Sequence, residues 1–188
     1  AQGPPGTGKT HVGGHVIARL AAWGWRIGVC AQSHAAVENV LSAVVRAGLA
    51  PAQAGKVAKA TPDPAWTSLP KADDLAAFAA QHDQVGRGYV IGGSAWDLTN
   101  ERRVARDQLD LLVIDEAGQF SVAKTLAVGV CARRLLLLGD PQQLPQVSTG
   151  VHAQPVDESA LGWLAAGEPV LPAHLGYFLE TTRRMHPD

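Results

Sequence analysis

The chain has 188 residues and a formal net charge of −1, and 46% of its residues are hydrophobic. This length and composition predict one compact domain with an ordinary buried core. The near-neutral charge excludes a protein that coats polyanions in general, so any contact with nucleic acid must be local. The sequence has neither a long apolar run nor a signal-peptide pattern at its start, so we expect a cytoplasmic protein with no membrane partner.

Apolar runs typical of strands alternate with stretches of helical spacing, which indicates βαβ units and a parallel sheet with helices on both faces. Helices are predicted at 10–24, 34–48, 72–82 and 121–132, with Gly24 and Gly48 closing the first two. The predicted strands are 26–31, 88–93, 109–116 and 133–140. The stretch 50–70 is rich in Pro, Ala and Lys, and we interpret it as a loose connection with one short strand near 56–60.

Both ends of the sequence fall inside patterns that should continue beyond them. A strand should precede a glycine-rich loop, yet only Ala1 and Gln2 stand before the loop "GPPGTGKT". At the other end, the unusual residue types of "LETTRRMHPD" continue up to the terminus. The sequence therefore predicts a domain that is truncated at both ends of a longer protein.

The segment "GPPGTGKT" fits the phosphate-loop pattern G-x-x-x-x-G-K-[ST]. Such glycines let backbone N–H groups turn toward phosphate oxygens at a helix N-terminus, Lys9 would reach the β and γ phosphates, and Thr10 would offer its hydroxyl to Mg²⁺. The alternative is a tight Gly/Pro turn that happens to precede a helix. The predicted ATP-binding residues are Gly3, Pro4, Pro5, Gly6, Thr7, Gly8, Lys9 and Thr10, with ATP and Mg²⁺ as cofactors.

The second half of an NTPase site should be an apolar strand that ends in an acid, and "LLVIDEAGQ" has this form. Asp115 would hold Mg²⁺ together with Thr10, and Glu116 would accept the proton of the attacking water. Acids at the carboxyl end of a central parallel strand lie in the ligand crevice. Alternatively, Asp115 and Glu116 cap the next helix. A third strand is followed by "GDPQQLPQV", where an amide could touch both the γ-phosphate and a polymer, or where Pro residues simply mark a turn.

Two further residue pairs have simpler interpretations. Cys30 and Cys131 lie far apart in apolar surroundings, which favours buried reduced thiols over a disulfide. His11 and His15 could share a helix face as metal ligands do, but Gly13 and Gly14 stand between them and no third ligand is evident.

Five blocks together resemble the motifs of superfamily 1 (1B) helicases, in the group of nonsense-mediated-decay, senataxin-like and Dna2-like enzymes. In order, "GPPGTGKT", "CAQSHAAVENVL", "IDEAGQ" and "GDPQQLPQV" are similar to motifs I, Ia, II and III, and "RRMHPD" is similar to the start of motif IV. "AQSHAAVENV", "GGSAWDL" and "DEAGQFS" look most like bacterial proteins in which such a helicase follows a RecB-like nuclease domain. The blocks span nearly the whole chain, and their order is more specific than any one motif.

The resemblance implies one RecA-like ATP-binding domain over 1–188, the N-terminal lobe of a helicase core whose second RecA-like lobe lies elsewhere in the same protein. It implies single-stranded DNA or RNA as partner and movement from 5′ to 3′, and the resemblance to nuclease–helicase fusions implies a RecB-like nuclease domain in the full-length protein. Gln143 would sense the γ-phosphate, and Arg184 would contact it. With Glu116, these two residues form the predicted catalytic set. The residues that would border the single strand are Ser33, His34, Gly92, Gly93, Ser94 and Trp96. The family commonly has an aromatic residue where Arg183 stands, which leaves open what packs against the adenine.

Two residue types on the nucleic-acid side, a tryptophan and three arginines, also have structural interpretations. Trp96 could stack a base, although core packing is the more frequent fate of an indole. Arg102, Arg103 and Arg106 could follow phosphates, although a solvated helix face is the more frequent explanation.

Three functions remain open at this point: an ATP-driven helicase or translocase half, a regulatory P-loop ATPase switch without helicase activity, and a scaffold domain.

Overall fold

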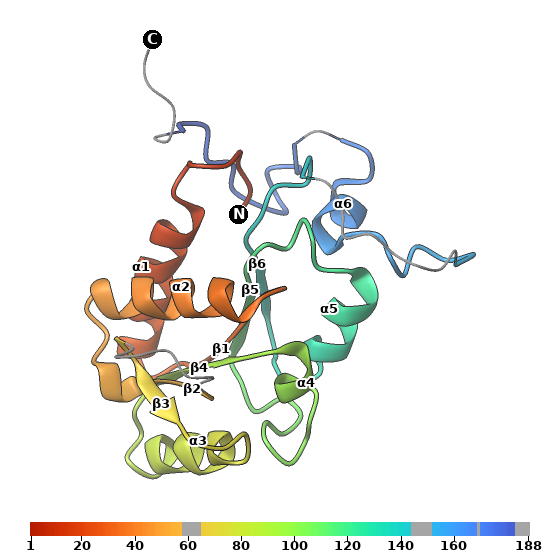
Figure 1. Cartoon of the computed structure of the whole chain (residues 1–188). Coiled ribbons are helices and arrows are strands. Elements are labelled where there is room, and N and C mark those ends of the chain that lie inside the picture. The colour runs from red at the N-terminus through yellow and green to blue at the C-terminus, as the bar shows by residue number, and fades with distance from the viewer. Residues whose placement is uncertain (58–64, 144–151, 169, 183–188) are drawn as a thin grey trace.

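A computed structural model of the chain describes residues 1–57, 65–143, 152–168 and 170–182. Six strands form one parallel sheet in the order β3-β2-β4-β1-β5-β6. Their bounds are Arg26–Cys30 for β1, Ala54–Val57 for β2, Thr67–Leu69 for β3, Tyr89–Gly93 for β4, Leu111–Ile114 for β5 and Leu135–Leu137 for β6. The sheet confirms the predicted α/β class, a RecA-like P-loop NTPase fold (Figure 1).

Helices cover both faces of the sheet, as predicted (Figure 1). Their bounds are Lys9–Ala22 for α1, His34–Arg46 for α2, Asp74–Gln84 for α3, Ala95–Leu98 for α4, Val122–Gly129 for α5 and Ala160–Ala165 for α6, with a short 3-10 helix η1 at Pro51–Gln53. Strand β5 shows how the pleat divides the core. Leu111 and Val113 pack with α1 and α2, whereas Leu112 and Ile114 pack with α3 to α6. A central strand that is apolar on both faces therefore contributes side chains to the hydrophobic core on each side of the sheet.

The stretch 50–70 is more ordered than expected, because its described residues hold η1 and two strands, β2 and β3, where the sequence predicted one strand. Lys56 explains why strand β2 is hard to recognise. This lysine is 1% exposed, and its Nζ lies 2.9 Å from Oε1 of Glu38 on α2 and 5.5 Å from the centre of the Trp66 ring. A charged side chain in a buried strand is tolerated only with such partners, and the partners come from other elements. The helices α4 and α6 were not predicted either.

The first residues of the chain extend the sheet beyond β6. Gln2 forms parallel bridges with Gly139 on one side and Phe178 on the other. The segment before the glycine-rich loop therefore lies between the end of β6 and the segment near the C-terminus. Among the described residues, no helix is both long and apolar enough to cross a membrane.

Candidate nucleotide-binding site

The loop of residues 3–8 has the backbone shape that a phosphate site needs. Gly6 and Gly8 have φ values of 85° and 82°, a left-handed conformation that glycine adopts without strain. Gly8 is the N-cap of α1, so the backbone N–H groups of the first helical turn point toward the loop. Nζ of Lys9 donates to the carbonyl oxygens of Gly3 at 2.6 Å and Pro4 at 3.0 Å. The ammonium group is thus held inside the loop, where it can face phosphate oxygens.

Thr10 and Asp115 come together at the base of this loop. Oγ1 of Thr10 lies 3.3 Å from Oδ2 of Asp115, which follows β5 directly. Asp115 is 6% exposed, and its Oδ1 accepts the backbone N–H of Glu116 at 3.0 Å. Burial raises the pKa of the Asp115 carboxyl, against the lowering effects of these hydrogen bonds and of the Lys9 charge. A cation bound nearby would therefore stabilise the ionised form of this buried carboxyl.

Glu116 has an unusual backbone and a perturbed side chain. Its φ of 56° lies in the left-handed region, which is uncommon for a residue other than glycine. Burial, followed by the charge of Asp115, raises the pKa of its carboxyl. A carboxylate with a raised pKa is a better proton acceptor, so Glu116 has the property that a general base needs.

The segment after β6 packs directly on the segment after β5. The N–H of Ala117 donates to the carbonyl of Leu138 at 2.9 Å, and a Cβ at Gly118 would stand 2.1 Å from the carbonyl oxygen of Asp140. Burial lowers the pKa of Lys9, and the charges of Asp140 and Asp115 oppose this. The carboxylate of Asp140 therefore acts on the same ammonium as Asp115, a contribution that the sequence pattern did not predict.

Gln143 lies in the turn that follows β6, where its N–H donates to the carbonyl of Asp140 at 3.2 Å, and its side chain is exposed. The other predicted catalytic residue, Arg184, and the neighbouring Arg183 lie outside the described residues. The roles predicted for Gln143 and Arg184 therefore stay predictions.

The segment 177–182 runs alongside the phosphate-binding loop, which the sequence did not predict. The N–H of Gln2 donates to the carbonyl of Tyr177, and the N–H of Leu179 donates to the carbonyl of Gln2. Farther along, Oγ1 of Thr182 donates to the carbonyl of Pro5 at 3.1 Å. The only sequence signal for this arrangement was the position of the segment just before "RRMHPD", since backbone pairing leaves no side-chain pattern.

The loops predicted to border a nucleic-acid strand begin at the same edge of the sheet. The last residue of β1, Cys30, is paired with Gly93 of β4 and with Ile114 of β5. The residues that follow these strands therefore start side by side at the carboxyl edge. Ser33 and His34 are exposed there, and Oγ of Ser33 caps α2 by accepting the N–H of Ala36 at 3.1 Å.

The next loop divides into buried and accessible residues. Gly92 and Gly93 are buried in β4, and a Cβ at Gly92 would stand 2.7 Å from Cγ1 of Val37 on α2. Their predicted contact with a nucleic-acid strand does not fit this burial, because the two glycines serve close packing of the sheet. Ser94 caps α4 in a capping box with Asp97, and Trp96 is 84% exposed. The interpretation of Trp96 as a core residue is therefore wrong, and a base could reach its indole.

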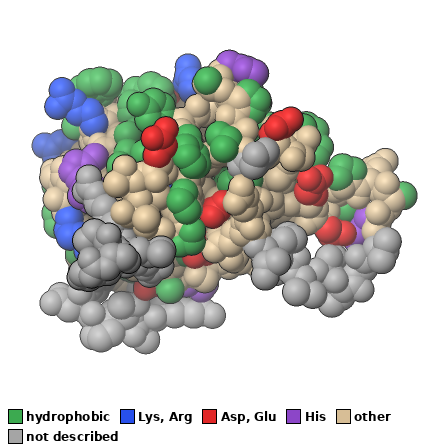
Figure 2. All heavy atoms as spheres, turned by 90° about the horizontal axis from the view of Figure 1, so that it is seen from above, with side chains coloured by type: hydrophobic (Ala, Val, Ile, Leu, Met, Phe, Trp, Pro, Cys, Tyr) green, Lys and Arg blue, Asp and Glu red, His purple; other side chains and the backbone are tan. Residues whose placement is uncertain are grey.

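The predicted basic helix at 102–106 is not a helix. These residues lie in turns, and the guanidinium of Arg103 pairs with Asp97 at 2.7 Å and Asp73 at 3.3 Å. Nε of Arg106 lies 3.8 Å from Oε1 of Glu101. These ion pairs make the segment a poor candidate for a phosphate track. Figure 2 shows the molecule from above, where acidic side chains are spread across the middle and Lys and Arg gather at one side, so the described side chains of this face form no continuous basic patch.

The residues that could hold Mg²⁺ are Thr10 and Asp115. One carboxylate and one hydroxyl, completed by phosphate oxygens and water, suit the few protein ligands that Mg²⁺ takes in nucleotide sites. The described residues contain no group of three or more His, Cys, Asp or Glu side chains that could hold a metal by themselves. The rings of His11 and His15 contact each other in a tilted arrangement, with their centres 4.5 Å apart. Cys30 and Cys131 are free and buried, as predicted, and burial raises their pKa values to about 12 and about 11.

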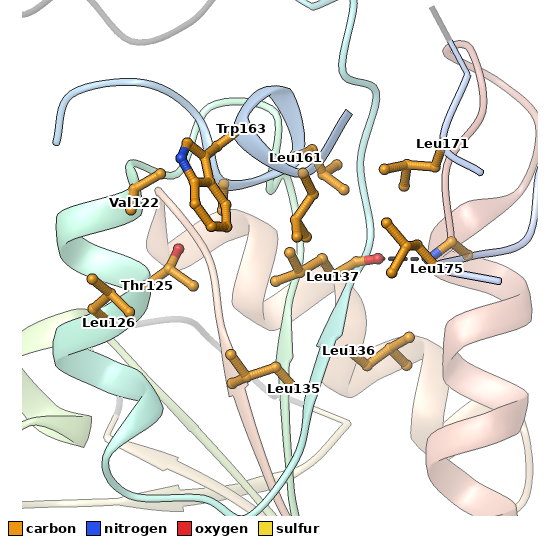
Figure 3. Close-up of a pocket in the computed structure, with 13 residues that line it drawn as sticks. Val122, Thr125, Leu126, Leu135, Leu136, Leu137, Leu161, Trp163, Leu171 and Leu175 are labelled. Carbon is orange, nitrogen blue, oxygen red and sulfur yellow. Dashed lines mark hydrogen bonds between the residues drawn. The ribbon is translucent and has the colours of Figure 1, made fainter. Parts of the chain in front are cut away.

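An apolar groove of about 290 Å³ lies at the edge of the sheet beside β6, away from the phosphate-binding loop (Figure 3). The N-terminal amine of Ala1 donates to the carbonyl of Leu137 at its side. The groove is lined mainly by leucines of β6 and by side chains of α5 and α6, and the described residues of its lining have no acidic or basic side chain.

Comparisons with known proteins agree with this site. The family described as "AAA domain" matches residues 1–160. The "DNA replication ATP-dependent helicase/nuclease DNA2" of Xenopus laevis is 28% identical over 155 residues, which cover 81% of this chain and 15% of that protein. DNA2 of Homo sapiens is 25% identical over 146 residues, and JHS1 of Arabidopsis thaliana is 25% identical over 152 residues. The match to the human protein covers 76% of this chain and 14% of that protein, and the match to JHS1 covers 81% of this chain and 11% of that protein. The chain therefore spans only a small part of the length of these relatives.

A solved structure titled "Complex structure of Arterivirus nonstructural protein 10 (helicase) with DNA" shares the fold with a TM-score of 0.51 and 19% sequence identity. The match covers 81% of this chain and 31% of that protein. At this identity the likeness concerns the fold, and the family match carries the assignment. The chain belongs to the family described as "AAA domain", and the relatives that it matches are named ATP-dependent helicase/nucleases.

Proposed function

We propose that the chain is the ATP-binding lobe of an ATP-dependent helicase or translocase that moves on single-stranded nucleic acid. The observation that carries the proposal is the contact between Thr10 and Asp115 beside the ammonium of Lys9. It joins the phosphate-binding loop to the acid after β5, and this combination serves Mg²⁺-assisted phosphoryl transfer. The names of the relatives, which are helicase/nucleases, favour this function over a regulatory ATPase switch.

In this proposal each residue of the site has one task. The loop N–H groups and Lys9 bind and orient the phosphates, and Thr10 and Asp115 hold Mg²⁺, which neutralises phosphate charge when bound. Glu116 accepts the proton of the water that attacks the γ-phosphate. Gln143 would sense the γ-phosphate, and Arg184 would add positive charge against it.

The nucleic acid would cross the carboxyl edge of the sheet, at Ser33, His34, Ser94 and Trp96. Backbone amides, hydroxyls and an exposed indole suit a strand that is bound without a basic track. The other proposed partners are the second RecA-like lobe of the same protein and a RecB-like nuclease domain, by similarity to relatives named helicase/nuclease. A cytoplasmic location stays a prediction.

Nucleotide binding by the chain tests the first part of the proposal. Titration with a fluorescent ATP analogue in Mg²⁺ should give saturable binding, and Lys9→Ala should weaken it strongly because the ammonium faces the phosphates. Lys71→Ala is a suitable control, since this lysine lies on the loop before α3, away from the site. Equal affinity of the wild type and Lys9→Ala would refute the site.

Phosphate release tests the second part. We expect the chain alone to be nearly inactive as an ATPase and unable to unwind a duplex, because an arginine from a facing domain can be worth about a thousandfold or more in phosphoryl transfer. The same chain extended through the second RecA-like lobe should hydrolyse ATP and respond to single-stranded DNA or RNA. A short chain as active and as polymer-responsive as the long one would contradict the two-lobe mechanism.

A further inference from the structure

A lysine is buried in the sheet, and the mechanism proposed above does not use it. Lys56 on β2 is 1% exposed, so its ammonium is shielded from solvent. Its Nζ donates to Oε1 of Glu38 on α2 at 2.9 Å and to the carbonyl of Val57 at 3.1 Å, and it lies 5.5 Å from the centre of the buried Trp66 ring. The charge and the hydrogen bonds of this lysine are therefore satisfied inside the protein.

The register of the strands places Lys56 near the carboxyl edge of the sheet. Lys56 is paired with Gly92 on β4, and Gly92 is paired with Val29 on β1. All three strands end one residue later. The lysine thus lies just inside the edge at which the residues proposed to contact nucleic acid begin.

The partner of this lysine belongs to the part of α2 that carries Ser33 and His34. Ser33 is the N-cap of the helix and His34 its first residue, and Glu38 follows His34 by four residues, about one turn. The contact between Glu38 and Lys56 therefore attaches the first turns of α2 to the sheet. A shift of this end of the helix would move Ser33 and His34 with it.

Apolar contacts set how closely α2 approaches the sheet. A Cβ at Gly92 would stand 2.7 Å from Cγ1 of Val37 and 2.8 Å from Cδ1 of Leu41, so the helix packs tightly on β4. Hydrophobic contact is non-directional, and it permits small shifts of a helix along its axis. A charge-assisted hydrogen bond is short and directional, so the contact between Lys56 and Glu38 favours one position of the helix.

Stability alone is a weak reason for this ion pair. Removal of two charges from water is unfavourable, and apolar side chains of similar size in place of a buried ion pair often give an equally stable or a more stable protein. The desolvation falls mainly on Lys56, since the side chain of Glu38 is 22% exposed. Buried polar groups can instead select one arrangement, as a buried polar residue fixes the register of a coiled coil.

We propose that the ion pair of Lys56 and Glu38 positions the N-terminal end of α2, and with it Ser33 and His34, for a nucleic-acid strand. The inference rests on the proposed function, because it requires a strand that binds at the carboxyl edge. It adds a buried determinant of strand affinity on β2, in a stretch for which the sequence predicts a loose connection with one short strand.

Replacement of the whole pair separates positioning from stability. Fluorescence anisotropy with labelled single-stranded DNA and RNA oligonucleotides measures strand affinity in the protein with both RecA-like lobes, and a fluorescent ATP analogue measures nucleotide affinity. Lys56→Met/Glu38→Leu should melt near the wild-type temperature and bind the ATP analogue like the wild type. It should bind both oligonucleotides about tenfold more weakly. This loss should be the same at low and high salt, because the buried Lys56 contacts no phosphate.

Three further variants serve as controls. Arg26→Met/Asp110→Leu removes a comparable ion pair at the amino edge of the same sheet, where Arg26 begins β1 and Asp110 precedes β5, and it should leave oligonucleotide affinity unchanged. Glu38→Gln keeps an oxygen that can accept from Nζ of Lys56, so it should bind oligonucleotides like the wild type. Lys56→Met alone should show the tenfold loss. The last two variants decide the question even where the double variant does not fold.

The outcomes distinguish the inference from the function on which it rests. Wild-type oligonucleotide affinity in the folded Lys56→Met/Glu38→Leu protein, or equal affinities of Glu38→Gln and Lys56→Met, would overturn the positioning role and leave the proposed function standing. An equal loss in Arg26→Met/Asp110→Leu, or a loss that changes with salt, would also overturn it. A wild-type two-lobe protein that binds no oligonucleotide would refute the proposed nucleic-acid function and this inference together.

Discussion

The hydroxyl oxygen of Thr10 lies 3.3 Å from Oδ2 of Asp115, although 105 positions separate the two residues in the chain. The contact joins the first turn of α1, the helix that follows the phosphate-binding loop, to the end of the central strand β5. Because the hydrogen bond holds the two oxygens beside each other, one hydroxyl and one carboxylate are available together to bind Mg²⁺ with a nucleotide. The same arrangement buries the carboxyl of Asp115, which disfavours its ionised form.

Asp115→Asn should raise the stability of the ligand-free chain at neutral pH. The pKa of Asp115 is raised by burial, so its ionised form is less favourable in the folded than in the unfolded chain. This destabilisation is present above the folded pKa and disappears as the pH falls below the unfolded value. We expect a melting temperature a few degrees higher for Asp115→Asn in thermal unfolding, together with loss of the Mg²⁺ dependence of ATP binding. A lower melting temperature would contradict the assigned effect of burial.

Asp110→Asn should have the opposite effect on stability and serves as its counterpart. The guanidinium of Arg26 holds the pKa of Asp110 below its usual range, with contacts of 3.0 and 2.9 Å to the two carboxylate oxygens. This contribution is present above the unfolded pKa and is lost as the pH falls through the folded pKa. We expect the substitution to lower the free energy of unfolding at pH 7 by about 1–2 kcal/mol. Denaturant unfolding at several pH values tests this, and a difference that persists under strongly acidic conditions would argue against the ion pair as its cause.

Glu116→Gln should separate chemistry from binding. In the protein with both RecA-like lobes, we expect turnover to fall about a hundredfold or more, as for a lost general base, while ATP affinity changes little. The wild-type rate should rise with pH, with its inflection above the ordinary pKa of a glutamate, because burial and the charge of Asp115 raise the pKa of Glu116. Steady-state phosphate release over a pH series measures both. Turnover of Glu116→Gln near the wild-type level would remove Glu116 from this role.

Trp96→Ala should weaken the binding of single-stranded oligonucleotides by about tenfold in the two-lobe protein, since one base stack on an aromatic ring has about this value. Trp163→Ala is the control, because this tryptophan is 52% exposed but borders the apolar groove of Figure 3. A photoreactive oligonucleotide should label Ser33, His34, Ser94 or Trp96. Labels confined to the segment 102–106 would place the strand elsewhere.

The sequence alone determined the class of the fold and half of the site. Apolar runs that are hydrophobic on both pleat faces, such as 111–114, predict buried parallel strands, because such runs are excluded from water on both sides. The pattern of Gly3, Gly8, Lys9 and Thr10 predicts a phosphate loop because the chemistry is local: the loop needs only its own backbone and one helix. These signals lie within short stretches, so one sequence is enough to recognise them.

Only the tertiary structure decided the features that depend on distant partners. It buried Lys56 in β2 against Glu38, and it brought the charge of Asp140 close enough to Lys9 to oppose the lowering of its pKa by burial. It also exposed Trp96, buried Gly92, and aligned the segment 177–182 with the phosphate-binding loop by backbone hydrogen bonds. Backbone pairing and burial depend on which elements meet, and residue types record neither when the partners belong to different elements.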